Sequence, residues 1–173
     1  MLALIVIFFQ ERISMLLPNY IFDKIYDIPK DFFKNLGINT LLLDADNTLA
    51  GDGEITLDLR VIDWVDAQKQ LGLRPVIFSN NNRERLKPLA KALGIGCIYS
   101  AKKPLICRIK NRLDPKSTAI IGDQIFTDVL CAKLFGCVSV KVAPIAEESG
   151  ISFKIRRRME ASIIQLYFIK RRK

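Results

Sequence analysis

Residues 38–53, INTLLLDADNTLAGDG, contain the pattern that decides the fold class of this chain. An apolar run from Leu41 to Leu43 is followed at once by two carboxylates, those of Asp44 and Asp46. Short continuous apolar runs are typical of strands that are buried on both faces of a sheet. The stretch therefore predicts a buried strand that carries two acidic side chains into the loop at its carboxyl end.

The rest of the chain repeats this pattern. Further apolar runs lie at 73–78, 117–121 and 137–142, with a weaker one at 95–99. Segments with helical spacing separate them, for example 57–71 and 86–94. Strands that alternate with helices predict βαβ units, which build a parallel sheet covered on both faces. We therefore expect an α/β fold, a three-layer sandwich with a central, mostly parallel sheet.

A chain of 173 residues suits one domain, and we expect an addition at each end. The domain itself would span residues 17–150 and open with short helical pieces across 19–37 that stop at Gly37. Residues 151–173 are predicted to form a basic amphipathic helix.

Residues 1–16 form an apolar leader with three open interpretations: an extra strand, a shallow interfacial anchor, or an over-extended start ahead of Met15. Its apolar run covers only residues 1–9, whereas a transmembrane helix needs about 20 such residues. The leader also lacks the basic region and cleavage site of a signal peptide, so we expect no export.

The composition excludes several reaction classes. The chain has no histidine, which rules out Ser-His-Asp triads, histidine phosphotransfer and histidine zinc sites. The four cysteines form no CxxC pair, so we expect reduced, mostly buried thiols. The formal charge of +9 is concentrated in residues 154–173, which hold eight Lys/Arg and one Glu.

The connections that follow the predicted strands are polar and contain DADNTL, SNNN, AKKP and GDQIFTD. Because the carboxyl ends of parallel strands meet at one edge of a sheet, these connections would gather a set of polar side chains: Asp44, Asp46, Thr48, Ser79, Asn80, Lys103, Asp123 and Asp128. Clustered carboxylates repel one another unless they bind a cation, and oxygen ligands favour Mg²⁺ over zinc. Such a site also suits phosphoryl transfer.

With these residues the chain resembles the haloacid dehalogenase (HAD) superfamily of phosphatases, subclass III, whose four motifs occur here in the expected order. The segments LLPNY, SNNNRERL, AKKP, GDQIFTD and VAPIAEE further resemble the YqeG-like subgroup, which is related to the mitochondrial phosphatidylglycerophosphate phosphatases. This resemblance covers residues 17 to 160, roughly, and implies a HAD-like, Rossmannoid phosphatase that uses Mg²⁺ and an aspartyl-phosphate intermediate.

The resemblance also implies the catalytic and metal-binding roles. Asp44 would be the nucleophile, Asp46 the general acid and later base, and Lys103 the cation that neutralises the phosphoryl group. Mg²⁺ would be bound by Asp44, Asp123 and the main-chain carbonyl of Asp46, while Asp128 would position the lysine or the waters of the metal.

Three further residues would bind the phosphoryl group or order its loop: Thr48, Ser79 and Asn80. For the lysine and for an arginine that contacts the substrate, the sequence offers two nearby candidates each. Lys103, the residue before Pro104, is favoured over Lys102, and Arg85 is favoured over Arg83 for contact with the substrate.

The spacing leaves no room for a cap domain, because 49–78 and 82–101 each hold little more than one helix and one strand. An open site suits a phosphomonoester on a bulky molecule that supplies its own cover. The resemblance favours phosphatidylglycerophosphate as substrate and phosphatidylglycerol as product. A soluble phosphatase for another bulky phosphomonoester, such as a nucleic-acid end or a phosphoprotein, is the alternative, and a non-catalytic binding module is a third.

The C-terminal residues Ile155, Met159, Ile163 and Leu166 recur at helical spacing, and basic clusters flank them. Such a helix is expected to lie on an anionic membrane surface, and a plainly docked helix is the alternative. We do not expect nucleic acid as a partner, because few aromatic residues alternate with the arginines. The expected location is cytoplasmic, peripheral at the inner face of the membrane.

Overall fold

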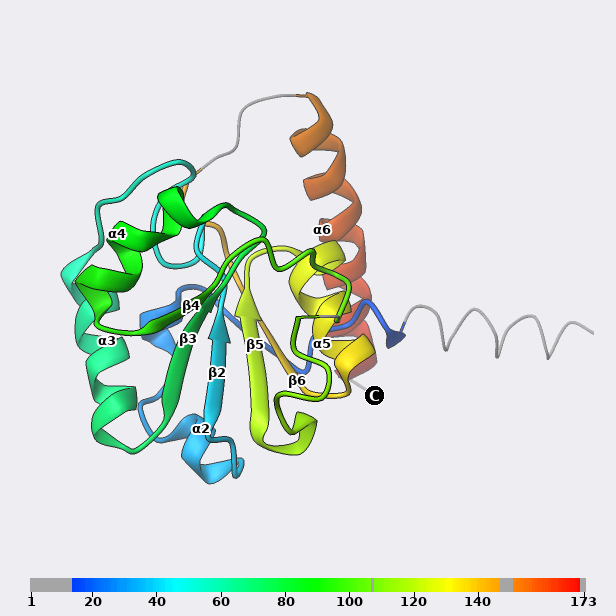
Figure 1. Ribbon diagram of the computed structural model, residues 1–173. Coiled ribbons are helices and arrows are strands. Elements are labelled where there is room, and N and C mark those ends of the chain that lie inside the picture. The colour runs from blue at the N-terminus through cyan, green and yellow to red at the C-terminus, as the bar shows by residue number, and fades with distance from the viewer. Residues whose placement is uncertain (1–13, 107, 147–150, 172–173) are drawn as a thin grey trace, which may run out of the picture.

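The computed structural model describes residues 14–106, 108–146 and 151–171 (Figure 1). Its elements follow one another in the order β1 (Tyr20–Phe22), η1 (Ile25–Asp27), α2 (Phe32–Asn35), β2 (Thr40–Leu43), α3 (Leu59–Gln70), β3 (Arg74–Phe78), α4 (Arg83–Leu93), β4 (Gly96–Ile98), η2 (Pro115–Ser117), β5 (Thr118–Gly122), η3 (Ile125–Val129), α5 (Leu130–Phe135), β6 (Val138–Val142) and α6 (Ile151–Arg171). The five predicted strands and the two predicted helices between them are confirmed.

One six-stranded sheet forms the centre of the protein, with the strand order β1-β6-β5-β2-β3-β4. All neighbouring strands run parallel. The chain moves from β2 outward through β3 and β4, and then returns to the other side of β2 as β5. The carboxyl ends of β2 and β5 therefore meet at the point where the strand order reverses, which is where open α/β sheets bind ligands.

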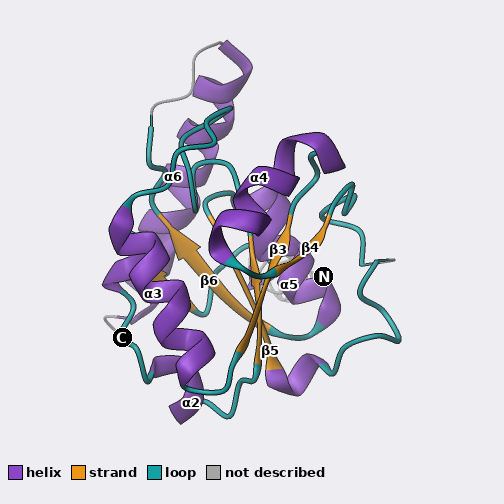
Figure 2. Cartoon of the chain, turned by 60° about the vertical axis from the view of Figure 1, so that its left-hand side comes forward, coloured by secondary structure: helices purple, strands orange, loops and turns teal. Residues whose placement is uncertain are grey.

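Helices cover both faces of the sheet, so the fold is the predicted three-layer α/β sandwich. Helices α3 and α4 lie on one face and α5 on the other, as Figures 1 and 2 show from two sides. The pleat of β2 supplies both cores: Leu41 and Leu43 join the larger cluster with α3 and α4, and Leu42 joins the smaller one with α5. This double burial explains the continuous apolar run before Asp44.

The prediction that residues 19–37 form only short helical pieces is partly wrong. Two short helices, η1 and α2, are present, but Tyr20–Phe22 is an edge strand that pairs with β6. Asn19 starts this pairing, because its side-chain oxygen accepts hydrogen bonds from the main-chain N–H and the hydroxyl of Ser139 at 3.0 and 2.8 Å. The partner lies 120 residues away, so local spacing could not predict the strand.

No cap domain is inserted in the segments 49–78 and 82–101, which the structure describes in full. The first contains only a loop, α3 and β3, and the second only α4 and β4 with their turns. The predicted absence of a cap is therefore confirmed.

Helix α6 packs beside η3 and next to the start of β1. It does not make these contacts through the predicted apolar residues Ile155 and Met159. Its buried side chains include Glu160 and Tyr167, and the hydroxyl of Tyr167 donates to the main-chain oxygen of Asn19 at 3.3 Å. On the opposite side of the helix, Ile155 and Met159 are 57% and 54% exposed. Ile163 is half-buried, and the side chain of Leu166 lies outside the described residues.

The leader and the predicted domain boundaries at residues 17 and 150 stay predictions. Residues 1–13 of the leader lie outside the described part of the chain, as do residues 147–150. Among the helices that the structure describes, none is both long and apolar enough to cross a membrane.

Candidate active site

Three carboxylates meet beyond the ends of β2 and β5. Asp44 follows β2, Asp123 follows β5, and Asp128 lies in the π-helix η3 (Ile125–Val129). All three side chains are buried, and one oxygen of each lies within 4.8 Å of the others. The fold therefore brings together acidic residues that are up to 84 positions apart in the chain.

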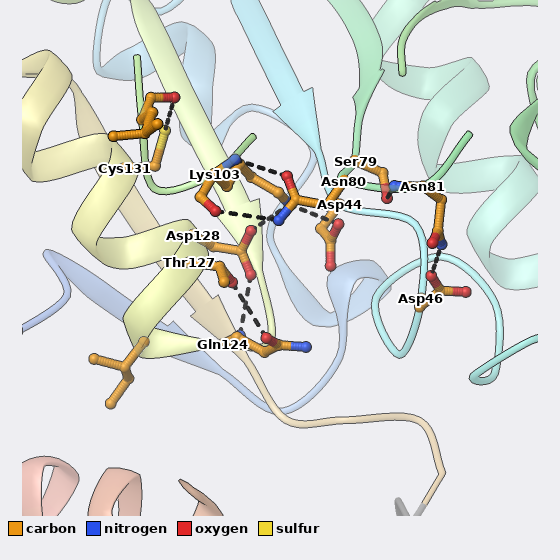
Figure 3. Close-up of polar contacts among 12 residues, drawn as sticks. Asp44, Asp46, Ser79, Asn80, Asn81, Lys103, Gln124, Thr127, Asp128 and Cys131 are labelled. Atoms are coloured by element: carbon orange, nitrogen blue, oxygen red, sulfur yellow. Dashed lines mark hydrogen bonds and ion pairs between the residues drawn. The ribbon is translucent and has the colours of Figure 1, made fainter. Parts of the chain in front are cut away.

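The ammonium group of Lys103 lies between two of these carboxylates (Figure 3). Its Nζ donates to Oδ1 of Asp44 at 2.6 Å and to Oδ1 of Asp128 at 2.5 Å. Lys102 is exposed, and Lys103 is 7% exposed. The structure thus places Lys103, not Lys102, in the acidic site.

Asn80 holds the main chain of Lys103 in place. Its Oδ1 accepts from the N–H of Lys103 at 2.6 Å, and its Nδ2 donates to the carbonyl of Lys103 at 3.1 Å. The sequence predicts Asn80 as a phosphate-binding residue through its own amide, and this role stays a prediction. The side-chain contact, which the sequence did not predict, shows how the loop after β3 positions the lysine.

Asp46 lies in a second polar group beside the three carboxylates. Its Oδ1 accepts from Nη2 of Arg85 at 2.7 Å, and its Oδ2 accepts from Nδ2 of Asn81. Arg85, rather than Arg83, therefore reaches the site, and its Nη1 is buried without a hydrogen-bond partner. The carboxylate of Asp46 is not part of the cluster of Asp44, Asp123 and Asp128, and its predicted metal contact through the main-chain carbonyl stays a prediction.

Asp128 needs the glycine at the end of β5. A Cβ on Gly122 would lie 2.2 Å from Cγ of Asp128, which is far too short for two carbon atoms that are not bonded to each other. The same carboxylate accepts from the N–H of Gln124 through Oδ2 at 3.1 Å. Both oxygens of Asp128 are thus engaged, one by Lys103 and one by the main chain, which suits a residue that positions the lysine.

Ser79 and Thr48 are buried in the loops after β3 and β2. The hydroxyl of Ser79 accepts from the N–H of Asn81 at 3.3 Å, so it orders the turn that carries Asn80. The hydroxyl of Thr48 is buried without a hydrogen-bond partner. Their predicted roles in phosphate binding stay predictions.

Helix α6 contributes to the site, which the sequence did not predict. The guanidinium of Arg157 bonds to the carboxylate Oδ2 of Asp123, and its Nη1 donates to the main-chain oxygen of Asp123 at 2.8 Å. Lys141 donates to that same oxygen at 2.9 Å. The one signal in the sequence was Glu160, the single acid of the basic tail, which accepts from Nη1 of Arg157 at 2.9 Å.

Burial controls the electrostatics of the cluster. Burial raises the pKa of Asp44 to about 8, against the effect of Lys103, which lowers it, and with the help of Asp128 and Asp123. Burial likewise raises the pKa of Asp123 to about 6, and Asp128 adds to this shift while Arg157 opposes it. Burial lowers the pKa of Lys103, but Asp128 and Asp44 outweigh it, so the net shift is upward. The three carboxylates together thus favour additional positive charge.

The residues of the cluster fit a divalent cation. Oδ1 of Asp123 is buried and has no hydrogen-bond partner, although a buried acceptor normally has one. The available donors are carboxylate oxygens, which suit hard cations. Asp44, Asp123 and Asp128 are therefore the residues that could hold a metal ion.

The described cysteines are not part of this site. Cys97 and Cys137 are free thiols, as the sequence predicts, Cys131 is buried, and Cys107 lies outside the described residues. Burial raises the pKa of Cys137 to about 12, which makes this thiol a poor nucleophile.

A parallel α/β sheet with a buried lysine and acidic cluster at its switch point defines a HAD-like phosphatase, a hydrolase that acts on phosphate monoesters. The chain belongs to the family described as "Mitochondrial PGP phosphatase", whose model matches residues 2–145. It is 32% identical over 154 residues to "Probable phosphatase YqeG" of Bacillus subtilis (strain 168), a match that covers 86% of this chain and 89% of that protein. The predicted resemblance is thereby confirmed.

The fold also resembles a solved structure. The crystal structure of an uncharacterized protein from Listeria monocytogenes serotype 4b superimposes with a TM-score of 0.53. The match covers 66% of this chain and 85% of that chain at 16% sequence identity, so it supports the fold alone.

Proposed function

We propose that this phosphatase is Mg²⁺-dependent, forms an aspartyl-phosphate on Asp44 and hydrolyses phosphatidylglycerophosphate to phosphatidylglycerol at a membrane surface. The observation that carries the mechanism is the contact of Lys103 with Asp44 at 2.6 Å, beside a carboxylate oxygen of Asp123 that has no partner. The lysine supplies positive charge at the attacking group, and the free oxygen of Asp123 leaves a place for a cation.

In the first step a carboxylate oxygen of Asp44 forms a bond to phosphorus, and the bond between phosphorus and the ester oxygen breaks. Asp46 donates its proton to the departing alcohol. In the second step Asp46 takes a proton from water, whose oxygen bonds to phosphorus and releases phosphate and the Asp44 carboxylate. Arg85 and Asn81, which bind both oxygens of Asp46, fix the direction of that carboxylate.

Mg²⁺ would be held by Asp44, Asp123 and the main-chain carbonyl of Asp46, with Asp128 positioning Lys103. When bound, Mg²⁺ neutralises charge on the phosphoryl oxygens. Lys103 performs the same task from the side of Asp128. Ser79 and the main-chain N–H of Asn80 are proposed to bind the remaining phosphoryl oxygens.

The substrate proposal is supported by the family and by the absence of a cap domain over the site. Neither 49–78 nor 82–101, both described in full, contains a domain that could close over a small metabolite. A lipid headgroup does not need such a cover, because the membrane surface itself excludes water.

A panel of phosphomonoesters tests this proposal. We expect the highest kcat/KM for phosphate release from vesicles that contain phosphatidylglycerophosphate, compared with sugar phosphates, nucleotides, nucleic-acid ends and phosphopeptides. EDTA should abolish the activity and Mg²⁺ restore it, while 1,10-phenanthroline should have no effect because no nitrogen or sulfur ligand is proposed. A higher kcat/KM for any soluble substrate would overturn the lipid proposal and leave the phosphatase activity intact.

The exposed side of α6 supports the membrane surface as partner. Ile155, Met159, Phe168 and Ile169 are each more than half exposed on this helix. Lysine and arginine residues flank them in the sequence, and each basic side chain near an anionic leaflet contributes about 1 kcal/mol to binding. Apolar side chains that enter the interface add to this attraction.

Sedimentation with vesicles tests this contact through point substitutions, because deletion of α6 would also remove Arg157 from the site. The double variant Ile155→Ser, Met159→Ser should lose about tenfold or more in affinity for anionic vesicles, since two exposed apolar side chains no longer enter the lipid. The matched control is Leu59→Ser, Leu105→Ser, which changes two side chains elsewhere that are 74% and 59% exposed and should bind as the wild type does. Wild-type binding should weaken with salt. Equal binding to neutral and anionic vesicles would contradict the proposal.

A further inference from the structure

Arg157 of α6 and its partners surround one side of Asp123. Arg157 binds the carboxylate oxygen Oδ2 and, at 2.8 Å, the main-chain oxygen of the same residue. Lys141 donates to this main-chain oxygen from β6 at 2.9 Å. Asp123 itself is fully buried, so these contacts replace the water that an exposed carboxylate would bind.

Glu160 fixes the guanidinium in turn. Glu160 is 2% exposed and uses both carboxylate oxygens: Oε2 accepts from Arg157 at 2.9 Å, and Oε1 accepts from the N–H of Ile125 at 2.7 Å. Ile125 opens the π-helix η3 that carries Asp128. The chain of contacts therefore runs from α6 to both Asp123 and the segment of Asp128.

The contacts of Arg157 with Asp123 use Oδ2 and leave the other oxygen, Oδ1, buried without a hydrogen-bond partner. A carboxylate with one oxygen fixed by a guanidinium cannot rotate freely about its Cβ–Cγ bond. The free oxygen is therefore held in one direction, on a carboxylate that has one oxygen within 4.8 Å of oxygens of Asp44 and Asp128.

We propose that Arg157 is a positioning residue that orients Asp123 so that Oδ1 is presented to a divalent cation. This inference rests on the proposed function, because it assigns Arg157 to the metal site of the same reaction. Outer partners of metal ligands act in this way in many metal sites, where they fix ligand orientation and strengthen binding. The C-terminal helix is thus a part of the metal site and not only a surface element.

Calorimetric titration with Mg²⁺ in lipid-free solution, without substrate, tests the proposal on the full chain. Arg157→Gln should weaken Mg²⁺ binding by about tenfold or more, as expected for the loss of an outer partner. Arg157→Lys should fall between this variant and the wild type, since lysine keeps the charge but lacks the planar fork of two nitrogens that spans Oδ2 and the main-chain oxygen of Asp123. Arg158→Gln removes the same charge from the next, exposed residue and should bind Mg²⁺ as the wild type does.

Two further readouts separate positioning from a loss of folding. Circular dichroism should be unchanged in Arg157→Gln, and the Mg²⁺ concentration for half-maximal activity should rise while kcat recovers at saturating Mg²⁺. If Arg157→Gln does not fold, Glu160→Gln serves in its place. It should raise the Mg²⁺ concentration for half-maximal activity by a smaller factor, because it weakens the hold on the guanidinium without removing it.

Equal or tighter Mg²⁺ binding by Arg157→Gln would overturn the role of Arg157; tighter binding would mean that the guanidinium competes with the metal. If the wild type itself binds no Mg²⁺, the metal assignment of the proposed function fails, and the role of Arg157 fails with it. The two failures are therefore distinguishable.

Discussion

Asp44→Asn is expected to lower turnover of any phosphomonoester by at least about 10⁴-fold, because an amide neither attacks phosphorus nor shares the charge of a metal ion. The substitution keeps the shape of the side chain. It also puts a neutral amide in place of a buried carboxyl group. Burial raises the pKa of that carboxyl group to about 8. We therefore expect the melting temperature of the metal-free variant to equal or exceed that of the wild type.

Steady-state release of phosphate, measured beside thermal unfolding, checks both expectations. The control is Asp52→Asn, which removes one exposed loop carboxylate from the same connection and should keep full activity. Turnover of Asp44→Asn within about tenfold of the wild type would mean that water, not Asp44, attacks the substrate.

Lys103→Met is expected to have the second largest effect. It removes the ammonium that lies 2.6 Å from Asp44 and 2.5 Å from Asp128, and turnover should fall by about 10²- to 10³-fold. It also leaves two buried carboxylates without their cation, which should lower the free energy of unfolding of the metal-free protein by about 3–5 kcal/mol. Lys102→Met, at the exposed neighbouring position, is the matched control and should change neither quantity.

The pH dependence of Lys103→Met gives a second test with a definite sign. Lys103 lowers the pKa of Asp44, so its removal raises that pKa further. Asp44 must be ionised to attack, and the acidic limb of the pH–rate profile should therefore move to higher pH in the variant. The loss of stability should be smaller at low pH, because Asp44, whose pKa burial raises, becomes protonated there. A profile that moves to lower pH would contradict the placement of Lys103 against Asp44.

The sheet could be predicted because its central strands are marked locally. Leu41 to Leu43 are buried on both faces, so their sequence is uniformly apolar, and the same holds for Ala119 to Ile121 in β5. The edge strand Tyr20–Phe22 could not be predicted in this way. Its partner β6 is distant in the chain, and the strand has only three residues, which is too short for a period to appear.

The acidic cluster could be predicted for a similar reason. Asp44, Asp123 and Asp128 each follow or adjoin a recognisable strand end, and parallel topology brings such ends together. Arg157 was not predicted, because it lies in a run of three arginines, and the nearby Glu160 could pair with Arg156 at i,i+4 as well as with Arg157 at i,i+3. Only the packing of α6 makes that choice.

The packing of α6 also explains why its amphipathic pattern is ambiguous from sequence. An apolar stripe predicts either a face buried in the core or a face directed at a membrane. The helix packs instead through Arg157, Glu160 and Tyr167, and leaves Ile155 and Met159 exposed. Polar contacts to the site therefore decide which side of the helix stays accessible.

Trapping of the phosphorylated enzyme tests the central claim most directly. An acyl phosphate on a carboxylate is reduced by borohydride to an alcohol, so an aspartyl-phosphate becomes homoserine after a rapid quench during turnover. Peptide mass spectrometry should find homoserine in place of Asp44, in the peptide that contains DADNTL, only when substrate is present. Reduction of a different carboxylate, or complete retention of Asp44 under conditions of steady turnover, would contradict the account.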